Sequence, residues 1–233
     1  MKLDSIIPYV GGKRLLRKKI VSLMPQHRTY VELFGGAMWV LLYKHPSKVE
    51  VYNDINEELV NLWWVVKEKP HELIEELKWY FPSRAVYNRL NAINPKELDD
   101  VKRAVRLIYI LKYSFGSTAN GFGRSVSYKP KSLNSTIRLI AKIADRLKTV
   151  YVENLDFEKC ISLYDTQDTL FYCDPPYYYA ERHYSIDFTK DDHIRLYECL
   201  KEVKGKWILS YNDHEFITNQ KTNITRKIFS RKI

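Results

Sequence analysis

The stretch "TYVELFGGAMWVLLYK", residues 29–44, indicates the fold class because it places a strand, a glycine turn and a helical segment in succession. Its first six residues, "TYVELF", are mostly apolar or β-branched, which is typical of a buried strand. The strand stops at Gly35 and Gly36, and the following "AMWVLLYK" is predicted to be helical. A strand that turns directly into a helix is the repeating unit of an α/β sheet protein.

Four further segments have the same strand-like character. They are "VEVYND" (49–54), "TVYVENLDF" (149–157), "TLFYCD" (169–174) and "KWILSYND" (206–213), each with Asn or Asp at or near its end. A helix, "INEELVNLWWVVK" (55–67), follows the first of them. Ligands of open α/β sheets bind beyond the carboxyl ends of the strands, so these polar residues predict a shared site there.

The alternation of strands and helices breaks at residues 61–134. Helical stretches, "PHELIEELKWYF" (70–81) and "DDVKRAVRLIYILKYSF" (99–115), precede "GSTANGFGRSVSYKPKSLN" (116–134), which is rich in Gly, Ser, Asn and basic residues. We therefore predict a small, mostly helical module over 61–134 that ends in a basic loop. It is inserted into a sheet domain made of residues 1–60 and 135–233.

The positive charge of the chain is concentrated in one segment. The formal net charge is +10, and residues 101–150 contain eleven Lys and Arg against a single acidic residue, Asp145. Such a segment is typical of a surface that follows phosphates, where counterion release drives binding. A solvated basic face would give the same composition, so charge alone leaves both alternatives open.

The cysteines and the distribution of apolar residues indicate the cellular compartment of the protein. Three cysteines without a CxxC pair predict neither a disulfide framework nor a structural zinc site. The N-terminus lacks the apolar core of a signal peptide, and no stretch approaches the roughly 18 apolar residues of a membrane helix. We expect a soluble cytoplasmic protein.

Two segments predict a nucleoside-containing ligand. The Gly35–Gly36 turn permits close approach of a ligand, although any β-α turn can contain such a pair. Asp54 lies 18 residues beyond Gly36, near the spacing at which an acid accepts ribose hydroxyls. Near the N-terminus, "PYVGGKRLL" lacks the P-loop spacing, which excludes a nucleoside triphosphatase. Its Lys13 either meets a ligand carboxylate or is an ordinary surface lysine.

The segment Asp174–Pro175–Pro176–Tyr177 is the most specific feature. Prolines cannot donate to a sheet ladder, and two in succession hold their carbonyls in fixed directions. A carboxylate beside a fixed carbonyl offers two acceptors to one planar amino group, and the tyrosine offers a face for stacking. The alternative is that the strand simply ends in a turn, which would explain one proline but not the whole arrangement.

With these residues in place, the chain resembles a known family. "FYCDPPY" (171–177) matches the [DNS]PP[YFW] motif of amino-methyltransferases, while "YVGGK" (9–13), "FGG" (34–36) and "ND" (53–54) resemble the cofactor motifs of Dam-like D12 class DNA adenine-N6 methyltransferases. The order of these motifs resembles the alpha group. "SFGSTANGFGRS" (114–125) is similar to the recognition segment of phage-type members.

The resemblance implies a Rossmann-like methyltransferase sheet with helices on both faces and a target-recognition module at 61–134. It implies methyl transfer from S-adenosylmethionine, without a metal, to the exocyclic N6 amine of an adenine flipped from double-stranded DNA. The implied catalytic residues are Asp174, Pro175, Pro176 and Tyr177. The implied cofactor-binding residues are Tyr9, Gly12, Lys13, Glu32, Phe34, Gly35, Gly36, Asp54, Asp156, Phe157 and Asp174.

For DNA, the predicted contacts are Lys112, Asn120, Arg124, Lys129 and Lys131. Arg124 is predicted to contact guanine, because arginine paired with guanine is the commonest specific base contact, and the lysines are predicted to contact phosphates. For Asp156 the alternative is a turn cap. His183 and His193 could serve as general bases, but such a family needs none, and surface or capping roles are expected.

Alternatives to this function remain open. After "SYND" the family normally continues through a longer region with a hairpin, so the short segment that follows here predicts shortened last strands and an exposed sheet edge. The chain could be a catalytically silent DNA-binding protein that retains the fold, or an RNA adenine methylase. We expect a monomer, with a dimer as the alternative. The target sequence is not predicted.

Overall fold

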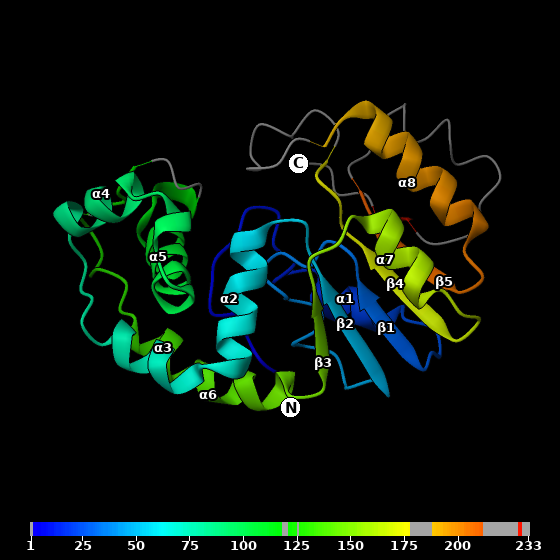
Figure 1. Cartoon of the computed structure of the whole chain (residues 1–233), viewed down its shortest axis with the longest axis horizontal. Helices are drawn as coiled ribbons and strands as arrows, with labels where there is room; N and C mark the ends of the chain where they lie inside the picture. Colours follow the sequence, from blue (N-terminus) through cyan, green and yellow to red (C-terminus); the bar gives the residue numbers. More distant parts are fainter. Residues whose placement is uncertain (1, 118–120, 125, 178–187, 212–227, 230–233) are drawn as a thin grey trace.

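The computed structural model describes residues 2–117, 121–124, 126–177, 188–211 and 228–229, and is built around one parallel sheet (Figure 1). Within these residues the sheet has six strands in the order β3-β2-β1-β4-β5-β6, and every neighbouring pair is parallel. The strands are β1 (Thr29–Glu32), β2 (Val49–Asn53), β3 (Val150–Glu153), β4 (Thr169–Cys173), β5 (Lys206–Ser210) and the two-residue β6 (Ile228–Phe229). The five predicted strands and the α/β fold class are confirmed.

The strand order reverses at the centre of the sheet. From β1 the chain proceeds to β2 and β3 on one side, whereas β4 pairs with the other side of β1, from Thr29 opposite Thr169 to Glu32 opposite Tyr172. All five residues of β4 are buried, as expected for a strand covered on both faces. A switch point of this kind leaves a crevice beyond the carboxyl ends of the two strands.

Helices cover both faces of the sheet, as predicted. The α-helices are α1 (Arg17–Ser22), α2 (Glu57–Glu68), α3 (Pro70–Leu77), α4 (Arg84–Ala92), α5 (Asp100–Tyr113), α6 (Asn134–Leu147), α7 (Phe157–Tyr164) and α8 (Lys190–Glu202). Because side chains alternate along a strand, Tyr30 of β1 joins the core under α2 and α6, while Val31 joins the core under α7 and α8. No helix in these ranges is long and apolar enough to cross a membrane.

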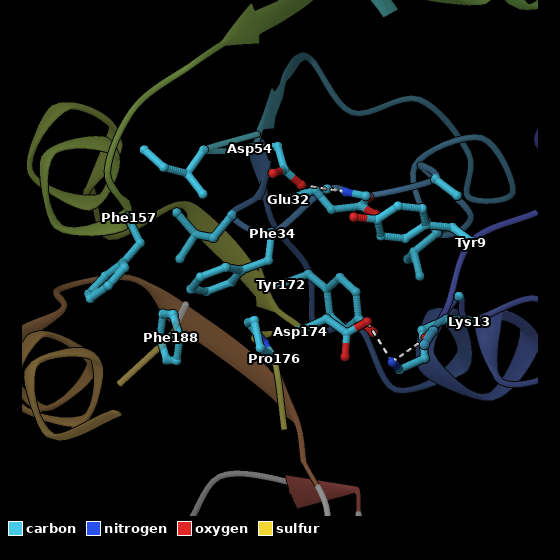
Figure 2. Close-up of a pocket in the computed structure, with 18 of the residues that line it drawn as sticks. Tyr9, Lys13, Glu32, Phe34, Asp54, Phe157, Tyr172, Asp174, Pro176 and Phe188 are labelled. Carbon is cyan, nitrogen blue, oxygen red and sulfur yellow. Dashed lines mark hydrogen bonds and ion pairs between the residues drawn. The ribbon is translucent and has the colours of Figure 1, made fainter. Parts of the chain in front are cut away.

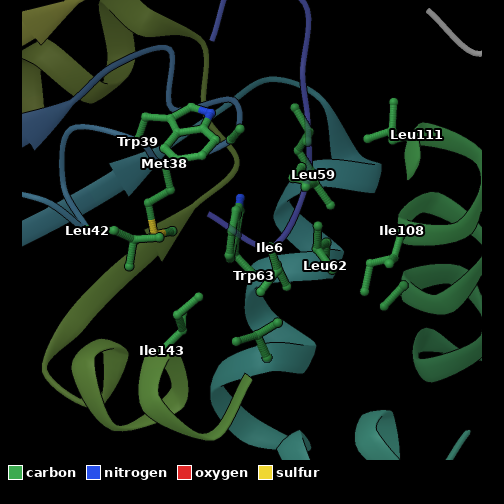
Figure 3. Packing of buried hydrophobic residues seen from close by; sticks show 14 of the residues in the cluster. Ile6, Met38, Trp39, Leu42, Leu59, Leu62, Trp63, Ile108, Leu111 and Ile143 are labelled. Atoms are coloured by element: carbon green, nitrogen blue, oxygen red, sulfur yellow. The ribbon is translucent and has the colours of Figure 1, made fainter. Parts of the chain in front are cut away.

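The helices α3, α4 and α5 form a lobe beside α2, away from the sheet (Figure 1). Leu59, Leu62 and Trp63 of α2 pack between Ile108 of α5 and Ile143 of α6 in one buried cluster (Figure 3). Burial of a side chain such as leucine contributes about 1.5–3 kcal/mol. The lobe is therefore joined to the sheet domain through one continuous core, and residue 61, the predicted start of the inserted module, lies inside α2.

Residues 37–44 differ from the prediction, because they form successive turns instead of an α-helix. Met38 has a φ of 56°, a left-handed conformation that an α-helix does not contain. The Leu41 N–H donates to the buried Glu32 carboxylate over 2.9 Å, not to a backbone carbonyl. The segment is thus shaped by contacts with the end of β1.

Candidate active site

A cavity of about 160 Å³ lies beyond the carboxyl ends of β1, β2 and β4 (Figure 2). Every residue that the resemblance assigned to the cofactor contributes to its wall: Tyr9, Gly12, Lys13, Glu32, Phe34, Gly35, Gly36, Asp54, Asp156, Phe157 and Asp174. These residues come from five separate segments of the chain. The fold therefore gathers the predicted set into one place.

The glycine turn is held rigidly at the base of the cavity. Gly36 has a φ of 47°, and its N–H donates to the Asp54 carboxylate over 2.8 Å. Its carbonyl accepts bonds from the Tyr52 hydroxyl at 2.9 Å and the Trp63 indole at 3.0 Å. At Gly35 a Cβ atom would lie 2.1 Å from the Tyr52 ring, so only glycine leaves room for that tyrosine.

The carboxylate of Asp54 is buried beside this turn. It also accepts the Asn56 N–H over 2.9 Å. Burial raises the pKa of Asp54 to about 6, against the opposing effect of the backbone hydrogen bonds from Asn56 and Gly36. Asp54 is thus a fixed acceptor whose charge changes in the mildly acidic range.

Three phenylalanines form one end of the cavity. Ring centroids are 5.7 Å apart for Phe34 and Phe157, 5.7 Å for Phe34 and Phe188, and 5.9 Å for Phe157 and Phe188. Phe188 was not predicted. A cue was present, because Thr189 and Asp192 form a capping box that starts α8, and this places the preceding Phe188 at the entry to the helix.

Lys13 and Asp174 form an ion pair at the other end of the cavity (Figure 2). The Lys13 ammonium lies 2.6 Å from Asp174 Oδ2 and also donates to the Gly11 carbonyl over 2.7 Å. Lys13 is only 6% exposed, so the alternative of an ordinary surface lysine is wrong. Burial alone would lower the pKa of Lys13, but the charge of Asp174 raises it. Burial raises the pKa of Asp174, and Lys13 opposes that effect.

The second oxygen of Asp174 has no partner. In the described part of the chain, Asp174 Oδ1 is buried and accepts no hydrogen bond. Pro176 lines the cavity next to it, and Tyr177 lies with its ring 5.0 Å from the Lys13 ammonium and stacked on Tyr211 at 5.8 Å. An unsatisfied buried acceptor costs about 1–3 kcal/mol, so its retention beside a cavity indicates a ligand that donates to it.

His193 does not lie on the surface, and that expectation is wrong. It is 4% exposed, its ring forms a T-shaped pair with the Phe188 ring with centroids 4.6 Å apart, and its Nδ1 is hydrogen-bonded to the Tyr211 hydroxyl. Tyr211, at the end of β5, was not predicted at the site. Its place behind Tyr177 depends on packing between segments that no local pattern reveals.

The predicted DNA contacts are divided between surface and interior. Arg124, Lys129 and Lys131 are exposed. Lys112 is buried, and its ammonium donates to the Thr136 hydroxyl at 2.7 Å at the start of α6. Burial and the nearby Lys131 lower the pKa of Lys112 to about 8. Asn120 and His183 lie outside the described residues.

In the described ranges, no group of three or more His, Cys, Asp or Glu side chains is arranged to hold a metal ion.

Comparisons with known proteins agree with this geometry. Residues 9–232 match the model of the D12 class N6 adenine-specific DNA methyltransferase family. The chain is 32% identical to the Type II methyltransferase M1.LlaDCHI of Lactococcus lactis subsp. cremoris, over 86% of this chain and 77% of that protein. It is 27% identical to the Type II methyltransferase M.MjaIII of Methanocaldococcus jannaschii, over 90% and 84%. It is 25% identical to a DNA adenine methylase of Vibrio cholerae, over 98% and 85%.

Proposed function

Because the chain belongs to the D12 class N6 adenine-specific DNA methyltransferase family, we propose that its cavity holds S-adenosylmethionine and that Asp174–Tyr177 hold the target adenine. The chain is an adenine-specific DNA methyltransferase, and DNA is its substrate. The assignment of individual residues below is the proposal.

The residues of the cavity fit this cofactor. Asp54 offers acceptors for ribose hydroxyls, and the rings of Phe34 and Phe157 offer faces for an adenine. The Lys13 ammonium lines the cavity, where it contacts Asp174, Gly11 and the Tyr177 side chain, and its positive charge can attract the methionine carboxylate. When bound, the cofactor supplies a methyl group already activated by a positively charged sulfur.

The unpartnered Asp174 Oδ1 is the observation that carries the catalytic assignment. One N–H of the adenine amine would donate to this oxygen, and the other to the Pro175 carbonyl. Both hydrogens are then held, and the nitrogen lone pair points at the methyl group in line with the bond that breaks. The amine becomes cationic during transfer, and the adjacent carboxylate stabilises that charge.

The Asp174 carboxylate can also accept the proton that the amine must lose after methylation. Burial raises the pKa of Asp174, which suits a carboxylate that takes up this proton before passing it to solvent. Tyr177 would stack on the flipped base. Stacking is worth about 1–3 kcal/mol per base, which helps offset the few kcal/mol needed to extract the base from the duplex.

We further propose that the module over 61–134 recognises the target through the connection from α5 to α6, with Lys129 and Lys131 on phosphates and Arg124 on a base edge. Their exposure supports this, whereas Lys112 is engaged between α5 and α6. The order of the motifs supports membership of the Dam-like alpha group. The Type II names of two relatives support a role in restriction-modification.

The proposal is tested by incubating the purified chain with tritiated S-adenosylmethionine and plasmid DNA from a methylation-deficient host. Label should enter duplex DNA as N6-methyladenine, and mapping the marks gives the target sequence. Binding of the cofactor without labelling of DNA would favour a catalytically silent DNA-binding protein. Labelling of RNA alone would favour an RNA adenine methylase.

A further inference from the structure

The guanidinium of Arg195 connects the first turns of two helices at the cavity. Its two terminal nitrogens bond both oxygens of Asp156, which precedes α7, at 3.0 and 2.9 Å. They also reach Asp192 in the first turn of α8 at 2.9 Å and Glu158 in α7 at 3.2 Å. A planar fork that meets a carboxylate through two parallel bonds fixes its orientation as well as its place.

One carboxylate oxygen of Asp156 accepts fewer hydrogen bonds than it can. Asp156 Oδ1 accepts the Glu158 N–H over 3.0 Å, as the cap of α7, in addition to the bond from Arg195. For Oδ2, the bond from Arg195 is the only one found in the described part of the chain. A carboxylate oxygen accepts about two hydrogen bonds, so Oδ2 retains one acceptor position.

The position of this group places it against the cofactor. Arg195, Asp156 and Phe157 all line the cavity, and the Arg195 guanidinium lies 4.4 Å from the centroid of the Phe157 ring. Phe157 in turn contacts Phe34 and Phe188. The carboxylate of Asp156 is thus fixed at the edge of the aromatic wall, where the rim of a stacked purine would lie.

Stability alone does not account for the arrangement. Arg195 and Asp156 are 40% and 41% exposed, where an isolated ion pair contributes little to folding, although a two-bond fork within a network of charges contributes more. Three carboxylates also surround a single cation, so the group carries uncompensated negative charge. Such a cluster is better explained by what it does to the orientation of one member.

We propose that Arg195 is a positioning residue: it holds Asp156 so that the remaining acceptor on Oδ2 receives the exocyclic amine of the cofactor's adenine. This inference rests on the proposed function, since it requires S-adenosylmethionine in the cavity. The Arg195–Asp156 pair would then select a cofactor with an adenine over a cofactor whose purine carries an oxygen in place of the exocyclic amine.

The test compares binding of S-adenosylhomocysteine and S-inosylhomocysteine by calorimetry. In the second compound a carbonyl oxygen replaces the adenine amine and faces the carboxylate with an acceptor instead of a donor. The wild-type chain should prefer the adenine compound, and Arg195→Gln should reduce that preference about tenfold or more. Arg195→Lys should also reduce it, because a lysine keeps the charge but cannot form the two parallel bonds.

Lys201→Gln is the matched control. Lys201 lies on the same helix and pairs with Glu198 at the same three-residue spacing, with 41% and 56% exposure. Its replacement should leave the preference unchanged.

The outcomes separate this inference from the proposed function. A preference ratio in both Arg195 variants within twofold of the wild type would overturn the role of Arg195, even if both affinities fell in parallel. A wild-type chain that methylates DNA but binds both compounds equally would overturn the inference alone. A chain that binds neither compound would contradict the assignment of the cavity to the cofactor.

Discussion

The Lys13 ammonium lies 2.6 Å from the Asp174 carboxylate, which joins the N-terminal turn to the end of β4 inside the cavity. Burial raises the pKa of Asp174, and Lys13 opposes that rise. Removal of the lysine should therefore raise the pKa of Asp174 further. In the proposed mechanism the carboxylate must be ionised to accept the adenine amine, so we expect activity only at a pH above that pKa.

We predict that Lys13→Met shifts the acid limb of the kcat profile to higher pH, whereas Lys13→Arg, which keeps the charge, shifts it less. Rates of methyl transfer measured from pH 5 to 9 at saturating cofactor check this, with the wild type as reference. An acid limb at the same pH in Lys13→Met would contradict the coupling.

Asp174→Ala removes the proposed acceptor for the adenine amine and the charge proposed to stabilise the amine as it becomes cationic. The loss of such preorganised groups typically costs about 10²–10³ in rate, and we expect at least that loss in single-turnover transfer. Affinity for S-adenosylhomocysteine should stay within about tenfold, because the contacts to the adenosine moiety remain. Transfer at the wild-type rate would exclude the mechanism.

The proposed contact of Asp54 with the cofactor's ribose predicts that cofactor binding depends on pH. Its pKa is raised by burial to about 6, so the carboxylate becomes protonated and loses acceptors for ribose hydroxyls as the pH falls below that value. We predict that the dissociation constant of S-adenosylhomocysteine rises by up to about tenfold per pH unit below 6.

Two variants identify the group responsible. Asp54→Asn should bind weakly and without this dependence. Glu32→Gln should retain it, because burial raises the pKa of Glu32 to about 8, outside the range concerned. Calorimetry between pH 5 and 7.5 measures all three proteins, and a dependence that persists in Asp54→Asn would assign it elsewhere.

Lys129 and Lys131 are predicted to neutralise phosphates. The double change to glutamine should weaken binding to all duplex sequences alike and reduce the slope of log affinity against log salt by up to about 2. Filter binding at several salt concentrations measures this. Lys48→Gln is the control, because that exposed lysine precedes β2 at the edge of the sheet opposite the cavity. Weakening confined to one sequence would instead indicate contact with a base.

Glu50 is the centre of a buried ion network that lies outside the active site. Its two oxygens each lie 2.5 Å from a cation, Lys44 on one side and Arg146 on the other. Glu50→Gln leaves two buried cations without their counterion, and breaking such a buried pair costs about 3–5 kcal/mol of unfolding free energy. Urea unfolding measures the loss, and Asp145→Asn, in an exposed pair with Lys148, should show no measurable change.

The sign of the pH effect follows from the same network. Burial alone would raise the pKa of Glu50, but hydrogen bonds and charges from Arg146 and Lys44 lower it below its ordinary value of 4.5. The stabilisation is therefore present above pH 4.5 and is lost as the pH falls through the lowered pKa. A wild-type stability that rose on acidification would contradict this.

The sheet was predictable from the sequence because parallel strands buried on both faces are nearly continuous apolar runs. The runs that end at Asp54 and Asp174 became β2 and β4, whose ends face the cavity, while Asn212 and Asp213 of the 206–213 run lie outside the described residues. Residues 37–44 were not predictable, because Met38 adopts a left-handed conformation and Glu32 captures a backbone N–H of the segment. Local propensity does not report such contacts.

The site was predictable where a residue sits at a strand end or a glycine turn. Arg195 and Tyr211 were missed because their places depend on how α8 and β5 pack in the sheet domain, whereas Phe188 had a local signal in the capping box of α8. Lys112 belongs to a basic segment, yet its contact with Thr136 joins residues 24 positions apart through the packing of α5 on α6. The ribose role of Asp54 was inferred from its spacing beyond Gly36, whereas the roles of Asp156 and Phe157 came from the family resemblance.

The continuous core around Leu59, Leu62 and Trp63 restricts how a new target sequence can be acquired. Exchanging the whole segment 61–134 for that of another enzyme would replace the second half of α2 and disrupt the core around it. The glycine turn depends on this core, because the Trp63 indole donates a hydrogen bond to the Gly36 carbonyl. Substitution of exposed residues in the connection from α5 to α6, such as Arg124, Lys129 and Lys131, avoids that damage. Under the proposed role of that connection in target recognition, specificity would diverge by changes there while the scaffold stays constant.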